Sequence, residues 1–228
     1  MKKIILFALL SVYITKAQNS FYKNALVLDV RTGIEVYNTT LKSTLTNGNT
    51  SRDTTITDKA ADTHFGFSTE YGLNKYFGIG ISANRHKFIT DKDTATGVKE
   101  DTRSTDFNLV LNFHAVSKKK FDLVLGADIG TSNFHFGTND KVNTILTGKG
   151  VYSSLYINPR IYFGPIGINV RLFTPMFSYK NVTTNNADFN KYNKINQLKG
   201  SAAWGLSFGI QYRLFKEKGS AGSSTASH

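Results

Sequence analysis

Hydrophobic and polar side chains alternate along most of this chain. In the stretch EYGLNKYFGIGIS, residues 70–82, aromatic or aliphatic residues take every second position on both sides of Asn74 and Lys75, and glycines stand between them. A period of two is that of a β-strand, whose successive side chains point to opposite faces of a sheet. The alternation predicts eight strands, in the ranges 26–37, 63–73, 76–88, 105–116, 121–133, 151–163, 166–176 and 202–215.

The two faces of these runs differ in composition. One face is apolar in every run, as in Phe107, Leu109, Leu111 and Phe113. The other face holds the strand glycines. A narrow barrel of about eight strands has an interior barely wide enough for its own side chains, so residues without side chains are needed between the large ones. The glycines on this lumenal face are Gly33, Gly66, Gly72, Gly78, Gly80, Gly126, Gly130, Gly167, Gly205 and Gly209.

The predicted connections alternate in length. The links after the second, fourth and sixth runs are short, at residues 74–75, 117–120 and 164–165, whereas the links after the odd-numbered runs hold about fifteen to twenty-five residues. Short periplasmic turns and long extracellular loops are typical of bacterial outer-membrane barrels. The pattern therefore predicts an all-β fold, a closed antiparallel transmembrane barrel of eight strands.

The N-terminus indicates export. Residues 1–17 combine lysines, a short apolar run and a small residue at Ala17, which is the layout of a cleaved signal peptide. The chain has no cysteine, so a lipid anchor and disulfides are excluded, and its mean hydropathy of −0.25 comes with no apolar run long enough for a membrane helix. The predicted organisation is a signal peptide at 1–17, a barrel domain at 18–215, and a disordered tail or engineered addition at 216–228.

The formal charge of +12 does not indicate a nucleic-acid partner, because an exported chain rarely meets nucleic acid. The lysines fall mainly in turns, loops and strand ends, where they face anionic lipid head groups, and Arg85, Lys87 and Arg103 lie at the other rim, where lipopolysaccharide phosphates would be. Outer-membrane lipids and lipopolysaccharide are the predicted surroundings.

The signal peptide, the EYGLNKYFGIGIS hairpin and the last run WGLSFGIQYRLF together resemble the small outer-membrane barrels of the OmpA, OmpX and OmpW kind, especially the single-domain versions of Bacteroidota. The resemblance implies insertion by the barrel-assembly machinery, which would read the last strand. It departs from the family pattern in the tail at 216–228. It also implies a structural or interaction role, in which other outer-membrane proteins are candidate partners.

Charged residues on the lumenal face form a candidate ion network. The arginines there present a planar fork that suits buried carboxylates better than lysine does. Such a network either fills and closes the barrel or lines a narrow selective pore, so a small-solute channel is the alternative function. The members are Asp29, Arg31, Glu70, Asp122, Asp128, Arg160, Arg171 and Arg213.

Histidines suggest a second lumenal site. If the turn at 74–75 pairs Gly72 with Gly78, the same register sets His64 opposite His86, with Asp106 on the next strand. Two imidazoles across a ladder can take a metal ion or sense pH, although a histidine near the mouth is also compatible with plain solvation. By similar counting His114 faces Asp122 as a structural pair. No cofactor is predicted.

Other features carry weaker hypotheses. His135 lies on the outward face near the outer rim, where lipid-modifying barrel enzymes place a catalytic histidine, but no serine and acid can be assigned beside it, so we expect no enzymatic activity. The strings Asp53-Thr54-Thr55 and Asp93-Thr94-Ala95 make Thr54 and Thr94 candidate O-glycosylation sites in outer loops. The last long link, residues 179–200, is a candidate contact surface or a merely solvated loop.

Overall fold

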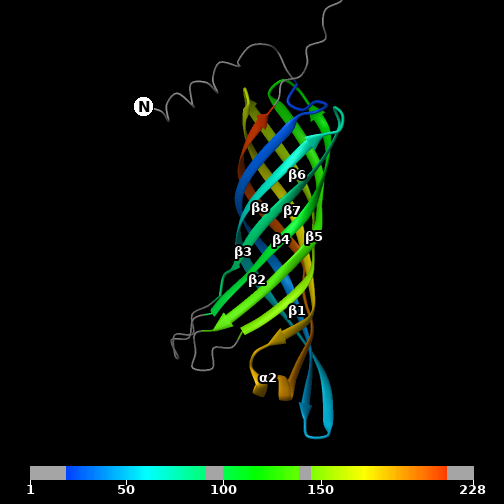
Figure 1. Cartoon of the computed structure of the whole chain (residues 1–228), viewed down its shortest axis with the longest axis vertical. Coiled ribbons are helices and arrows are strands. Elements are labelled where there is room, and N and C mark those ends of the chain that lie inside the picture. The colour runs from blue at the N-terminus through cyan, green and yellow to red at the C-terminus, as the bar shows by residue number, and fades with distance from the viewer. Residues whose placement is uncertain (1–18, 91–99, 139–144, 215–228) are drawn as a thin grey trace, which may run out of the picture.

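The computed structural model describes residues 19–90, 100–138 and 145–214. The predicted signal peptide, the tail at 216–228 and Thr94 lie outside these ranges. The described strands pair in chain order, and β1 also pairs with β8, so the sheet closes into a barrel (Figure 1). The predicted all-β, closed antiparallel sheet is therefore confirmed. The strands are β1 (Leu26–Asn47), β2 (Thr50–Gly72), β3 (Phe77–Phe88), β4 (Glu100–Ser117), β5 (Phe121–Thr138), β6 (Ile145–Phe163), β7 (Ile166–Thr184) and β8 (Asn193–Leu214).

Glycines and turn residues set the short connections. In the β2–β3 hairpin Gly72 pairs with Gly78, as the sequence predicts, and the Asn74 side chain accepts hydrogen bonds from the backbone N–H groups of Tyr76 and Phe77 at 2.7 and 2.9 Å. The short turns and the N-terminal end of β1 lie at one end of the barrel, and the β1–β2 hairpin and helix α2 (Ala187–Tyr192) lie at the other (Figure 1). No helix among the described residues has the length and apolar character of a membrane span.

The long outer loops of the prediction are largely strand. β1 and β2 continue through 38–62 to a tight turn in which Gly48 has a φ of 59°, so that Thr44 pairs with Asp53. The last long link likewise holds the end of β7, the short helix α2 and the start of β8. The prediction was wrong here because the outward positions turn polar beyond Val36, and alternation then disappears while the backbone ladder continues.

The outer wall is apolar and the lumen is polar, the reverse of a soluble protein. Outward residues such as Phe65, Ile81 and Leu155 are 60, 65 and 61 % exposed, while lumenal residues such as Asp29 and Arg171 are buried. An exposed apolar surface of this extent needs a covering, and a closed barrel with every strand paired can present it to lipid.

Aromatic rings pack over glycines across the strand pairs. At Gly205, for example, a Cβ would lie 2.6 and 2.7 Å from ring carbons of Phe173, its partner across the ladder. The lumen is therefore filled by rings that lie on the neighbouring strand, and the glycines make room for them. The cross-strand pairs of this kind are Tyr156 with Gly126, Tyr179 with Gly150, Tyr162 with Gly167, Phe177 with Gly200 and Phe173 with Gly205.

Candidate functional site

The lumen is the candidate site, because most of the buried charges of the described residues lie in it. Its charged side chains occur in successive groups along the barrel. We name these groups from the short-turn end, which is at the top of Figure 1. The lower group, with Glu70 and His114, lies toward the short turns, the middle group of arginines and aspartates lies beside it, and the upper group of histidines and carboxylates lies toward the outer hairpins.

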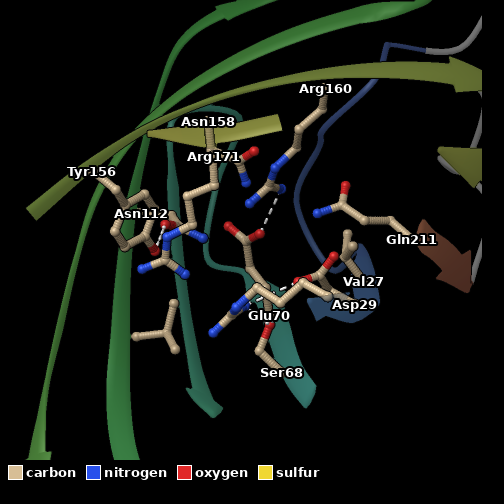
Figure 2. A pocket seen from close by; sticks show the side chains of 12 residues that line it. Val27, Asp29, Ser68, Glu70, Asn112, Tyr156, Asn158, Arg160, Arg171 and Gln211 are labelled. Carbon is tan, nitrogen blue, oxygen red and sulfur yellow. Dashed lines mark hydrogen bonds and ion pairs between the residues drawn. The ribbon is translucent and has the colours of Figure 1, made fainter. Parts of the chain in front are cut away.

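The lower group joins three strands through Glu70. Arg160 on β6 donates to Glu70 on β2 at 2.7 Å, and Figure 2 shows these two side chains pointing toward each other across the lumen. His114 on β4 lies between two carboxylates, with Nε2 2.8 Å from Glu70 and Nδ1 2.9 Å from Asp122. Arg160 is also 3.7 Å from Asp122. Two carboxylates are thus matched by one guanidinium and one imidazole, all hydrogen bonded.

The middle group pairs the remaining lumenal arginines. Arg31 donates to Asp29 at 2.9 Å and lies 3.9 Å from Asp128, and Arg171 donates to Asp128 at 2.5 Å. The guanidinium of Arg171 also covers the Tyr156 ring at 3.3 Å. Arg171 is therefore held by a carboxylate on one side and an aromatic face on the other, an arrangement that planar guanidinium groups favour.

Arg213 does not belong to the carboxylate network, contrary to the prediction. It donates to the carbonyl oxygens of Asn19, Ser20 and Gly164 at 2.8, 2.6 and 3.2 Å, and lies 4.9 Å above the Tyr162 ring. Because β8 ends just beyond it, Arg213 reaches the end of the barrel rather than its middle. It fastens the N-terminal segment there.

The N-terminal segment closes this end of the lumen. Phe21 is fully buried and its ring stacks on His114, with centroids 3.4 Å apart and planes 9° apart. Tyr22 is buried beside it. The segment is fixed by backbone hydrogen bonds, including Asn24 N–H to Gly72 O at 2.8 Å. Residues 19–25 therefore form a plug under the charged groups.

The upper group contains the predicted histidine pair. His64 and His86 face each other across β2 and β3 with ring centroids 5.6 Å apart, and His86 Nε2 lies 2.8 Å from Asp106. Two further carboxylates join them: Glu35 lies 3.1 Å from His64 Nδ1, and Asp62 lies 3.3 Å from His86 Nδ1. All five side chains are buried, so the predicted location at an open mouth is wrong.

An aromatic layer separates the histidines from the outer end. Tyr37 donates to Glu35 and packs against Phe177, with ring centroids 5.0 Å apart. Tyr179 continues the layer against Phe177 at 5.1 Å, and Phe134 packs against Tyr179. Tyr37 is the last residue of the predicted first run, but Phe134, Phe177 and Tyr179 lie beyond the predicted ends of the fifth and seventh runs, which is why the sequence interpretation left the mouth open. The lumen is thereby closed at both ends by aromatic side chains.

Two small spaces lie between these groups in the lumen. One lies among Asp29, Glu70, Arg160 and Arg171 (Figure 2), and the other beside Glu35 and His64. Each has about 10 Å³ of free volume, which is close to the minimum that holds one water molecule.

The remaining predicted residues lie apart from the lumen. His135 is half-buried on the outer wall between Arg103 of β4 and Thr147 of β6, and neither partner supplies the serine and acid of a hydrolytic site. Thr54 lies in β2, paired with Ser43 in the projecting hairpin, not in a loop.

Glu35 and Asp62 are the site residues that sequence reasoning missed. Glu35 lies on the lumenal face of the first run, where alternation alone was enough to identify it. Asp62 was assigned to a loop because it precedes the apolar part of β2. The available signal for Asp62 was its position two residues before His64, on the same face of the strand.

Comparison with known proteins shows a similarity of fold but does not assign the chain to a family. No protein-family model matches the chain, and no curated protein matches it by sequence. Among solved structures, the outer membrane protein OprG from Pseudomonas aeruginosa is 13 % identical, covers 85 % of this chain and 97 % of its own, and gives a TM-score of 0.57. The outer membrane protein AlkL is 15 % identical, covers 90 % of this chain and 97 % of its own, and gives a TM-score of 0.51. The chain thus has the fold of small outer-membrane β-barrels.

Proposed function

We propose that this chain is an eight-stranded barrel that spans the bacterial outer membrane, without enzymatic or channel activity, and that it acts as a structural or interaction protein. The observation that carries the proposal is a filled lumen inside an apolar wall. The wall supports a lipid environment, and the likeness to two proteins described as outer membrane proteins supports the same location.

The filled lumen argues against the small-solute channel. A conducting path would have to pass the Phe21 plug, the Glu70–Arg160 pair and the layer around Phe177, and the two spaces found between the charged groups are water-sized. Ion pairs of buried groups with good geometry are costly to break, because each partner left alone is an uncompensated charge. The ion network therefore opposes the separation of its members that a conducting path would need.

Single-channel recording tests this part of the proposal. Purified full-length protein in planar lipid bilayers should give no unitary conductance steps. A second sample with Phe21→Ala and Phe177→Ala removes one ring at each end and shows whether the charged groups alone hold the seal. Regular steps in the unaltered protein would establish the channel and refute the closed lumen.

The outer hairpins are the proposed contact surface. β1 and β2 project beyond the apolar wall to Gly48, and α2 lies beside that hairpin (Figure 1). The outward residues there are polar or charged, and a few apolar side chains are exposed among them, such as Leu45 and Ile56. Partners of this surface are other outer-membrane proteins, in a larger envelope complex.

A pull-down from native outer membranes in mild detergent tests that role, with stoichiometry read by mass spectrometry. A near-equimolar partner that is lost when residues 43–54 are replaced by a two-residue turn would support an accessory subunit. Recovery of the barrel alone, with either protein, would refute a stable complex and leave the structural role.

A further inference from the structure

We propose that Glu35, Asp62, His64 and His86 form a buried binding site for one divalent transition-metal ion of the zinc class. The inference does not depend on the proposed function, since it concerns a group of side chains inside the barrel. The sequence suggested a metal or pH site from two histidines and Asp106. The structure supplies a different ligand set and gives Asp106 another part.

The donor atoms converge on one point. One ligand atom from each of the four side chains lies within 4.8 Å of every other. Glu35 Oε1 is 3.1 Å from His64 Nδ1 and 3.6 Å from His86 Nδ1, and Asp62 Oδ2 is 3.3 Å from His86 Nδ1. Metal–ligand bonds of about 2.0 to 2.1 Å in a tetrahedron place the ligand atoms about 3.3 to 3.5 Å apart. These three separations match a tetrahedral site, and the remaining ones, which extend to at most 4.8 Å, need the side chains to move inward when the ion binds.

These contacts are not hydrogen bonds. Both carboxylate oxygens of Asp62 and the Nδ1 atoms of His64 and His86 are buried and have no hydrogen-bond partner of acceptable geometry. Asp62 is completely buried, and the two histidines are 4 and 2 % exposed. A buried carboxylate without a partner is costly, and a cation bound between the donor atoms would remove that cost.

The charge balance also favours a bound metal ion. The nearby Arg31 and Arg171 are matched by Asp29 and Asp128, and the described ion pairs of Glu35, Asp62 and Asp106 go only to histidine nitrogens. Three buried carboxylates therefore depend on two imidazoles. A divalent ion with neutral imidazole ligands offsets two of the three negative charges, and imidazole and carboxylate together suit zinc-class ions.

The surroundings orient the ligands. His86 Nε2 lies 2.8 Å from Asp106 Oδ2 as an ion pair without hydrogen-bond geometry, and Asp106 Oδ1 accepts from Ser132 at 2.5 Å. Nδ1 of the same ring is thus left to face the donor cluster. Tyr37 donates to the second oxygen of Glu35, which leaves Oε1 for the ion. A carboxylate behind a ligating imidazole is the usual outer shell of zinc sites. Asp106 is thus a positioning residue for His86.

The lower histidine provides a matched control. His114 is equally buried and also lies between two carboxylates, but its contacts to Glu70 and Asp122 are hydrogen bonds, and Arg160 neutralises the group. The same residue types in the same lumen therefore give a satisfied ion network in one place and an open donor set in the other.

The test is metal content of the full-length protein, purified in detergent, stripped with a chelator while unfolded, and refolded with Zn²⁺ or with Mg²⁺. We expect about one tightly held Zn²⁺ per folded chain, no retained Mg²⁺, and a higher unfolding temperature with Zn²⁺. Co²⁺ in place of Zn²⁺ should give the visible absorption of a tetrahedral nitrogen–oxygen site. Unaltered folded protein that retains no Zn²⁺ and shows no temperature shift would overturn the proposal and leave protons as the balancing cations.

Variants locate the site. Asp62→Asn and His64→Gln keep side-chain size and should abolish stoichiometric Zn²⁺ retention, and Asp106→Asn should weaken binding about 10- to 100-fold through the orientation of His86. His114→Gln should leave Zn²⁺ binding unchanged. Folding of each variant is checked by its heat-dependent shift on electrophoresis, and only folded samples are compared. Retention in a folded Asp62→Asn, His64→Gln double variant would contradict the assigned ligands.

Discussion

Gly205 tests the principle that glycines make room for lumenal rings. A Cβ at this position would lie 2.6 and 2.7 Å from two ring carbons of Phe173, closer than carbon atoms normally approach. Phe173 itself cannot move freely, because it is buried and packs edge-on against His64, with ring centroids 5.5 Å apart. Gly205→Ala should therefore destabilise the barrel by about 1 to 3 kcal/mol, the usual cost of overpacking.

A second substitution separates this clash from a general effect of alanine. Phe173→Leu alone should cost stability through a cavity, but the pair Gly205→Ala, Phe173→Leu should lose less than the sum of the two, with a coupling of about 0.5 to 3 kcal/mol. Gly137→Ala is the matched control. A Cβ there would have one neighbour, His135 Nε2 at 3.4 Å, so the change should stay within about 0.5 kcal/mol.

The assay is equilibrium urea unfolding of refolded protein in detergent or lipid, followed by the fluorescence of Trp204, the chain's single tryptophan. Trp204 is 55 % exposed on the outer wall and neighbours the substituted site, so transition midpoints and slopes are compared rather than amplitudes. A Gly205→Ala protein as stable as the unaltered one, or strictly additive effects in the pair, would refute the reasoning.

Three further predictions follow from the lumen and its surroundings. Gly78→Leu should unfold or strongly destabilise the barrel in the same urea assay, because even a Cβ there would lie 2.9 Å from Cγ and Cδ of Glu70; a folded variant of unchanged stability would show that the lumenal face is assigned wrongly. Arg160→Met should cost about 3 to 5 kcal/mol, since it leaves Glu70 and Asp122 with His114 alone, whereas Lys119→Met in an exposed turn should change little; equal effects would contradict the network. His135→Ala should leave the lipid A mass spectrum unchanged, and an altered spectrum would contradict the proposed absence of enzymatic activity.

Most of the fold follows from alternation, and the failures have physical reasons. Between Phe77 and Ala83 every outward residue is apolar, as expected for a surface in contact with lipid. The period of two is therefore visible, and it predicts which side chains point outward and which point into the lumen. After Val36 in β1 and before Thr105 in β4 the outward positions turn polar, and hydrophobicity no longer records the ladder that the backbone continues to make. The strand lengths were therefore underestimated.

The same limit explains the outcome for the sites. The register of one tight turn was enough to place His64 opposite His86. Lumenal facing was enough to put Arg160 and Arg171 in one network with the buried acids, although the individual pairs came only from the structure. Closure at the ends was not visible, because Phe21 reaches His114 from outside the sheet, and Phe177 and Tyr179 lie where the predicted strands had stopped. Contacts between residues without a common ladder require the three-dimensional structure.

The most direct test of the account is the side of the membrane on which each end of the barrel lies. The chain has no cysteine, so single cysteines are clean reporters. Gly48→Cys at the tip of the β1–β2 hairpin should react with a membrane-impermeant maleimide on intact cells, whereas Lys119→Cys in a short turn should react only after the outer membrane is opened. Equal labelling of both positions on intact cells, or of neither, would contradict a barrel that spans the outer membrane with its hairpins outside.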